Sequence, residues 1–116
     1  MKNNIRRSVF VLEQNIRNIR SVREWAYLMG YPSPKTFSRL FRNEFGLRPK
    51  RYMDQIRLKA IMDSFLEMPE DKYYCIALNV GLEDEQALYK FVKNHLGLSP
   101  TVVKTQVLKE NSALAA

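Results

Sequence analysis

The sequence predicts an all-α fold of about seven helices, and three observations support this prediction. Apolar residues recur at spacings of three and four in successive segments, as they do along the buried face of a helix. Capping residues, prolines and glycines separate these segments from one another. Finally, the pattern of one part of the chain returns 51 residues later, which indicates one structural unit present twice.

Composition limits the class of protein. At 116 residues and 46% apolar content, the chain can bury a core as one compact unit or two very small ones. Its net charge of +7 points to a polyanionic partner or an anionic membrane surface, and the basic residues concentrate in the first half. A single cysteine excludes an internal disulfide and a zinc site built on cysteine pairs. No secretory leader or bilayer-spanning apolar run is recognisable, so we expect a soluble, cytoplasmic protein.

Two helices are predicted before the first glycine. An apolar residue at every third or fourth position predicts an amphipathic helix over residues 4–18. The S-x-x-E capping box that starts at Ser21 begins a second helix, which runs to about Met29. Phe10 and Val11 lie off the apolar stripe of the first helix. They either pack on the second helix or mark where another domain or subunit docks.

The most informative stretch is the helix predicted from Ser33 to Phe45. Ser33 can cap it, Pro34 suits its first position and Gly46 can end it. Its two faces differ, with Phe37, Leu40, Phe41 and Phe45 on one side and Lys35, Ser38, Arg39 and Arg42 on the other. Such a helix either enters the major groove of DNA or is a core helix with an ordinary solvated basic face.

The second half of the chain is also predicted to be helical. A long helix runs from Pro49 to about Leu66, a short one covers about Lys72 to Val80, and another covers about Asp84 to His95. Residues 101–108 are expected to form a final helical turn or two. Asn111–Ala116 is weakly patterned and expected to be frayed.

An internal repeat is the strongest signal in the sequence. At the offset of 51 residues, identical residues pair as Ala26/Ala77, Gly30/Gly81, Asn43/Asn94, Gly46/Gly97, Leu47/Leu98 and Pro49/Pro100. Each unit has two short helices joined by a glycine turn, which is the helix-turn-helix pattern. The predicted division is a first helix-turn-helix subdomain at 1–50, a linker helix at 51–68, a second subdomain at 69–108 and a frayed tail at 109–116.

The linker helix suggests a mode of binding. Its length would be about 27 Å at 1.5 Å per residue. Successive major grooves on one face of DNA lie about 34 Å apart. A single chain could therefore place two recognition helices in adjacent grooves without forming a dimer.

These motifs resemble the DNA-binding domain of the AraC/XylS family of bacterial transcription regulators, over about residues 5–105. The matching motifs are A-x-x-x-G-Y from Ala26, F-S-R-L-F-R-x-E-F-G-L-x-P from Phe37, Y-M-x-x-I-R-L from Tyr52, I-A-x-x-V-G-L from Ile76 and L-G-L-S-P from Leu96. The resemblance implies an all-α domain with two helix-turn-helix subdomains joined by the linker helix. It also implies sequence-specific DNA binding, usually for activation.

The resemblance also implies which residues meet DNA. The base-reading positions of the family fall on Lys35, Ser38, Arg39, Gln86, Tyr89 and Lys90. Arginine can bond guanine O6 and N7, and glutamine can pair with adenine N6 and N7, so the side-chain chemistry agrees. Contacts to DNA phosphates are expected from Thr36, Arg42, Arg48, Lys50, Arg51 and Lys93.

The second unit departs from the family pattern. Glu83, Asp84 and Glu85 place three acids where a phosphate would approach. They either cap the helix and favour its dipole, or, in the case of Glu85, accept a hydrogen bond from cytosine. Core positions that are usually aromatic in the family hold smaller residues here, namely Leu82, Leu88 and Val92. We therefore expect the second unit to bind DNA more weakly and to be less stable.

No catalytic, cofactor or metal site is predicted. His95 has no cysteine or histidine neighbour, and Cys75 is interpreted as a surface or partly buried thiol. No nucleophile motif or phosphate loop is present, so we do not expect an enzyme.

The expected partner is double-stranded DNA, with RNA polymerase as a further candidate and no membrane. DNA would be bound by a monomer or through a dimerisation domain outside this sequence. Two alternatives stay open. The chain could be a basic helical module that docks on a protein or membrane surface, or a family member whose second unit contacts protein rather than bases.

Overall fold

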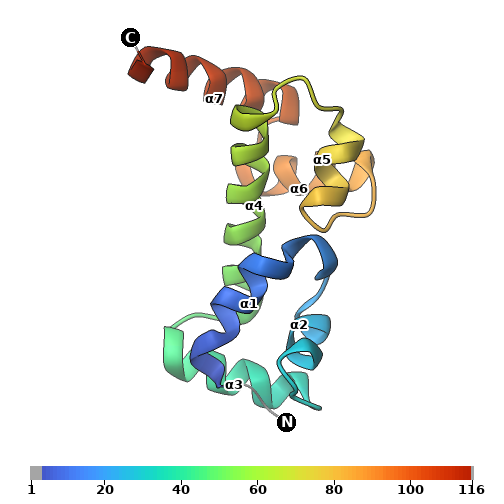
Figure 1. Ribbon diagram of the computed structural model, residues 1–116, viewed down its shortest axis with the longest axis vertical. Coiled ribbons are helices and arrows are strands. Elements are labelled where there is room, and N and C mark those ends of the chain that lie inside the picture. The colour runs from blue at the N-terminus through green and yellow to red at the C-terminus, as the bar shows by residue number, and fades with distance from the viewer. Residues whose placement is uncertain (1–3, 116) are drawn as a thin grey trace. The chain divides into compact units, whose positions relative to one another are not determined.

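The structure is a computed structural model that describes residues 4–115, and within them it contains α-helices and short 3-10 turns but no strand. The all-α prediction is confirmed, with seven α-helices over the described residues (Figure 1). Contacts divide the chain into two compact units, Met1–Arg57 and Leu58–Ala116, called here the first and second unit.

The first unit begins with a helix that is broken into three pieces. These are η1 (Ile5–Arg7), α1 (Ser8–Asn15) and η2 (Ile16–Asn18). The sequence predicts one continuous helix over residues 4–18, and the structure corrects this. The Ser8 hydroxyl donates to the Ile5 carbonyl at 2.6 Å, and the Asn15 side chain donates to the Val11 carbonyl at 2.8 Å. Such local side-chain bonds compete with regular helix geometry, and Asn15 itself adopts a non-helical φ of −127°.

An aromatic cluster holds the remaining helices of this unit together. They are α2 (Val22–Leu28), α3 (Pro34–Phe45) and the start of α4 (Pro49–Glu67). Trp25 of α2 is fully buried, and its ring lies 5.1 Å from both Phe37 and Phe41 of α3 in edge-on geometry. Its indole N–H donates to the Ser8 carbonyl at 3.0 Å. The apolar face of α3 is thereby fixed against α2, and its opposite face turns outward.

The turns of the two helix-turn-helix motifs have the same hydrogen bonds. In the first unit, the Tyr31 amide donates to the Ala26 carbonyl at 2.9 Å; in the second, the Leu82 amide donates to the Ala77 carbonyl at 2.8 Å. The glycine before each has a positive φ, 85° at Gly30 and 84° at Gly81. This is the Schellman motif, in which a left-handed residue ends a helix and satisfies its last carbonyls. The internal repeat is therefore present in backbone geometry as well as in sequence.

The second unit packs the C-terminal part of α4 with three further helices. They are α5 (Tyr73–Asn79), α6 (Glu85–Leu96) and α7 (Pro100–Ala115). Its core consists mostly of aliphatic side chains, with Phe65 as its fully buried aromatic ring. Lys72, which precedes α5, provides no side-chain cap for this helix. The smaller residues at positions 88 and 92 are fully buried in this core.

The last helix is longer than predicted. One or two turns were expected over residues 101–108 with a frayed segment after them, but α7 continues to Ala115. The residues after Lys109 include alanine, leucine and glutamate, which are good helix formers, and no glycine or proline interrupts them. Residue 116, the end of the predicted frayed tail, lies outside the described residues.

The residues off the apolar stripe of the first helix take different places. Val11 packs against the first core, whereas Phe10 remains 55% exposed. Cys75 is exposed, which agrees with its interpretation as a surface thiol.

Candidate nucleic-acid interface

Helix α3 is the best-defined element of the candidate interface. The Ser33 hydroxyl caps its start by accepting from the Thr36 amide at 3.4 Å, and Pro34 occupies the first turn. Gly46 ends it in the left-handed conformation, with φ of 78°, and its amide donates to the Arg42 carbonyl at 2.9 Å. These caps match those predicted from the sequence.

The outward face of α3 presents the side chains predicted to read bases. Lys35 and Arg39 are exposed, and Ser38 is half-buried between them. Neither cation forms an ion pair with any other described residue. The acid on this helix, Glu44, accepts from Arg6 at 2.8 Å and is thereby neutralised. The helix therefore presents uncompensated positive charge at the surface.

A recess of about 570 Å³ lies beside this face. It is bordered by residues of α2, α3 and the start of α4, namely Val22, Ser38, Arg39, Arg42, Asn43, Arg48, Pro49 and Lys50. All of its charged residues are basic. A second recess of about 350 Å³ adjoins it and is bordered by Arg42, Gly46, Leu47, Arg48 and Arg51. The structure thus gathers four predicted phosphate-binding residues, Arg42, Arg48, Lys50 and Arg51, around two neighbouring hollows.

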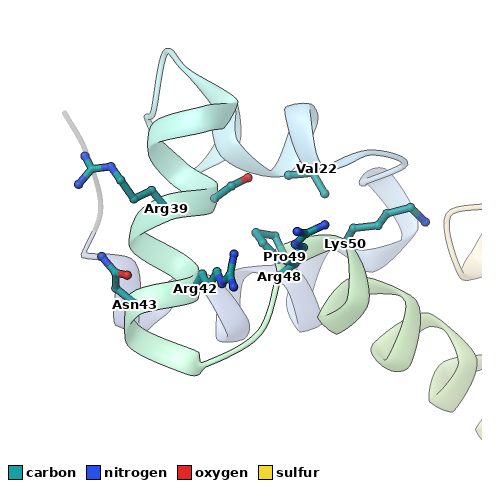
Figure 2. A pocket seen from close by; sticks show the side chains of 8 residues that line it. Val22, Arg39, Arg42, Asn43, Arg48, Pro49 and Lys50 are labelled. Atoms are coloured by element: carbon teal, nitrogen blue, oxygen red, sulfur yellow. The ribbon is translucent and has the colours of Figure 1, made fainter.

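The cations around the larger recess point in different directions. Figure 2 shows Arg42 extending from α3 towards Arg48 and Pro49, whereas Arg39 extends from the other side of α3. Lys50 extends away from Arg48, and its ammonium contacts the Asp54 carboxylate at 2.8 and 2.9 Å. Arg42 therefore extends towards Arg48 across the recess, and neither of these two arginines forms an ion pair with a described residue.

Helix α6 is the counterpart of α3 in the second unit. The Asp84 carboxylate caps it by accepting from the Ala87 amide at 2.8 Å, so the capping interpretation of this acid is correct. Gln86, Tyr89 and Lys90 are exposed on its surface, as base reading would require. Lys93 is also exposed, but its ammonium donates to the Gly97 carbonyl at 3.3 Å at the end of its own helix.

The two units differ sharply in charge. The first unit contains thirteen basic and four acidic residues, a formal charge of +9, whereas the second contains six and eight, a charge of −2. The electrostatic attraction for a polyanion therefore resides in the first unit.

One cation of the first unit lies inside the fold. Arg57 of α4 is only 3% exposed, and its guanidinium donates to the Ile19 carbonyl. Burial lowers the pKa of Arg57, while the nearby carboxylates of Asp54 and Glu24 act in the opposite direction. Arg57 therefore belongs to the structural framework and is not available to DNA.

Sequence reasoning missed several residues of this site. Val22, Asn43 and Pro49 border the larger recess but were not among the predicted contacts. The pairing of Lys50 with Asp54 has a signal in the sequence, because residues four apart face each other on a helix. No such signal brings Val22 to the recess, since only the packing of α2 on α3 places it there.

Comparison with known proteins agrees with this geometry. A family model described as a helix-turn-helix domain, of the AraC type, matches residues 31–106, which is more than half of the chain. The chain belongs to the AraC/XylS family. This family consists of DNA-binding transcription regulators and is not a class of enzymes.

Individual relatives extend the comparison. An uncharacterised helix-turn-helix transcriptional regulator of Haemophilus influenzae is 31% identical over 75 residues, covering 65% of this chain and 25% of the relative. The chain thus spans about a quarter of the length of that relative.

Solved structures show the same fold. A transcriptional regulator with an AraC-type DNA-binding domain from Chromobacterium violaceum superposes with a TM-score of 0.70 at 23% identity, covering 89% of this chain and 90% of that one. The DNA-binding domain of AdpA, a global transcriptional factor solved with its target DNA, gives a TM-score of 0.74 at 21% identity, covering 90% and 93%. At these identities the likeness establishes the fold alone. Among the described residues, no helix combines the length and apolar character needed to cross a membrane.

Proposed function

We propose that this chain is the sequence-specific DNA-binding part of a transcription regulator, with α3 as its main recognition helix. The observation that carries the proposal is the outward face of α3, where Lys35, Ser38 and Arg39 lie opposite two fully buried phenylalanines. Arg39 can bond guanine O6 and N7 together, and Lys35 can reach the same edge. The fixed caps and aromatic packing of α3 keep these side chains in one geometry.

We further propose that α6 enters a second major groove. Gln86 suits adenine, and Tyr89 and Lys90 can contact adjacent base edges or sugars. The repeated turn geometry supports equivalent roles for α3 and α6. Helix α4, which contributes to both units, has 19 residues, a rise of about 28 Å at 1.5 Å per residue. That length is compatible with successive grooves about 34 Å apart, so one chain would suffice.

Contacts to the DNA backbone would come chiefly from the first unit. The proposed phosphate contacts are Thr36, Arg42, Arg48, Lys50, Arg51 and Lys93. Lys50 and Lys93 already have partners within the protein, so we expect them to contribute less than the arginines. The charges of +9 and −2 on the two units support the larger contribution of the first unit to contacts with the DNA backbone.

We propose activation as the regulatory outcome, in the cytoplasm of a bacterium, with RNA polymerase as the candidate protein partner. The family resemblance supports this proposal. DNA would be bound by one chain or by two chains joined through a dimerisation domain outside this sequence.

A second candidate function follows from the acids of the second unit. Glu83 and Glu85 flank the capping Asp84 and are exposed at the start of α6, where they would oppose a phosphate. In this alternative only α3 reads DNA, and α6 contacts a protein such as polymerase.

Selection of bound duplexes from a random pool tests these candidates. Two conserved blocks about 10 base pairs apart support reading by both α3 and α6. A single block with a one-groove footprint favours protein contact by the second unit. If the chain binds anionic vesicles but no duplex, DNA binding is contradicted and docking on a membrane surface is favoured.

A further inference from the structure

We propose that the recess between α2, α3 and the start of α4 seats one sugar-phosphate of the DNA backbone, with its phosphate held between Arg42 and Arg48. This proposal rests on DNA binding by the chain and adds a defined phosphate seat that only the first unit possesses. It also ranks Arg42 and Arg48 above the other cations of the surface.

The charges of the recess favour a single bound anion. Arg42 extends from α3 towards Arg48, which precedes α4, so the two arginines come from separate elements and border the same recess (Figure 2). Both are exposed, and neither forms an ion pair with a described residue. A phosphate between them would accept charge-assisted hydrogen bonds from both, and arginine suits this role because its planar fork matches phosphate oxygens.

The pairing of Lys50 narrows the choice of cations. Its ammonium is held by Asp54 of the same helix and extends away from Arg48 (Figure 2). Arg39 also borders the recess but extends from the other side of α3, so Arg42 and Arg48 are the cations that remain for a phosphate here.

The shape of the recess fits a sugar as well as a phosphate. Val22 and Pro49 give it apolar walls beside the arginines, and its volume of about 570 Å³ exceeds the needs of a bare phosphate. The C–H face of a deoxyribose can lie against such walls while the phosphate meets the guanidinium groups. The first-turn amides of α4 lack partners within their helix and add positive potential at this end.

The internal repeat provides a comparison within the same chain. At the offset of 51 residues, Lys93 and Ser99 stand where the first unit has Arg42 and Arg48. Lys93 donates to the carbonyl of Gly97, and the Ser99 hydroxyl accepts from the Val102 amide at 3.4 Å. Both groups of the second unit are thus used within the protein. The seat is a feature of the first unit and does not follow from the repeated fold.

The repeat also supplies a test variant that should fold. Arg48→Ser installs the residue that the second unit uses at the equivalent position, where it precedes a helix without disturbing it. Arg42→Ala removes the other cation, and the two changes together test their coupling. Arg17→Ala is the matched control, because it removes one exposed charge that borders neither recess. Trp25 fluorescence during urea unfolding checks that the first unit of each variant is folded.

The decisive measurement is a scan of the selected duplex in which single phosphates are replaced, one at a time, by neutral methylphosphonates. For the unmodified protein, one position beside the block read by α3 should weaken binding about tenfold. In Arg48→Ser and in Arg42→Ala, a methylphosphonate at that same position should no longer weaken binding. The scan of Arg17→Ala should match that of the unmodified protein. The double variant should lose less affinity than the product of the two single losses, since both arginines hold one phosphate.

Two results separate failure of the seat from failure of DNA binding. If the duplex binds but every methylphosphonate still weakens binding of Arg48→Ser and Arg42→Ala as it does for the unmodified protein, the proposed phosphate site is wrong. The proposed function then stands. If the unmodified protein selects no duplex at all, the proposed function fails and the seat fails with it.

Discussion

The guanidinium of Arg57 donates to the carbonyl oxygen of Ile19, and both residues are buried. Ile19 lies in the segment between η2 and α2, whereas Arg57 lies within α4. This bond therefore joins the long helix to the segment that leads into the first helix-turn-helix. The contact places this charge inside the first unit and away from its surface.

We expect Arg57→Ala to lower the free energy of unfolding of the first unit by about 2–3 kcal/mol. The change leaves a buried carbonyl without its donor, which costs about 1–3 kcal/mol, and it removes buried side-chain packing. Trp25 lies in the same core and is the only tryptophan, so its fluorescence during urea unfolding reports on this unit. Lys59→Ala, at an exposed position of the same helix, should stay within about 0.5 kcal/mol of the unmodified protein. An equal free energy of unfolding for Arg57→Ala and Lys59→Ala would contradict the structural role of Arg57.

Replacing Arg39 by alanine should weaken binding to the selected duplex by about 1–3 kcal/mol and relax the preference at one base pair. The reason is the loss of a bidentate contact to a base edge. Fluorescence anisotropy against duplexes that carry each base at that position measures both effects. The control Arg17→Ala should weaken all duplexes slightly and equally. Unchanged affinity and preference in Arg39→Ala would show that the reading face lies elsewhere.

The affinity for DNA should fall steeply with salt. If about six phosphates are neutralised, the slope of log K against log salt concentration should be near −5, at roughly −0.9 per phosphate. Lys50→Ala should weaken all sequences about equally, and by less than Arg48→Ser, because Lys50 is paired with Asp54. Titrations at four salt concentrations supply these slopes. A slope near zero for the unmodified protein contradicts the electrostatic account.

In the second unit, Asp84→Ala should destabilise α6 by about 0.5–2 kcal/mol, because its carboxylate accepts from the Ala87 amide. Asp84→Asn keeps an oxygen acceptor at the cap, so it should destabilise α6 much less than Asp84→Ala does. Hydrogen exchange of the α6 amides is the suitable measurement, since this unit contains no tryptophan. A matching Glu83→Ala variant should leave exchange unchanged. Equal protection in Asp84→Ala and the unmodified protein would contradict the capping role.

Much of the local structure could be predicted from the sequence. Ser33, Pro34 and Gly46 defined the ends of α3, because caps and left-handed glycines act over only a few residues. The repeat at 51 residues likewise predicted the two matching glycine turns. The N-terminal helix was predicted less well, since the side-chain bonds of Ser8 and Asn15 break a pattern that looked regular.

The sequence by itself therefore determined most of the helices, the caps of α3, the repeat and the family of this protein. Only the tertiary structure decided that Arg57 lies inside, that Asp54 holds Lys50, and that Arg42 points towards Arg48 beside Val22 and Pro49. The physical reason is range. Helix formation and capping depend on neighbours along the chain, whereas the direction and pairing of a charged side chain depend on which other elements pack around it.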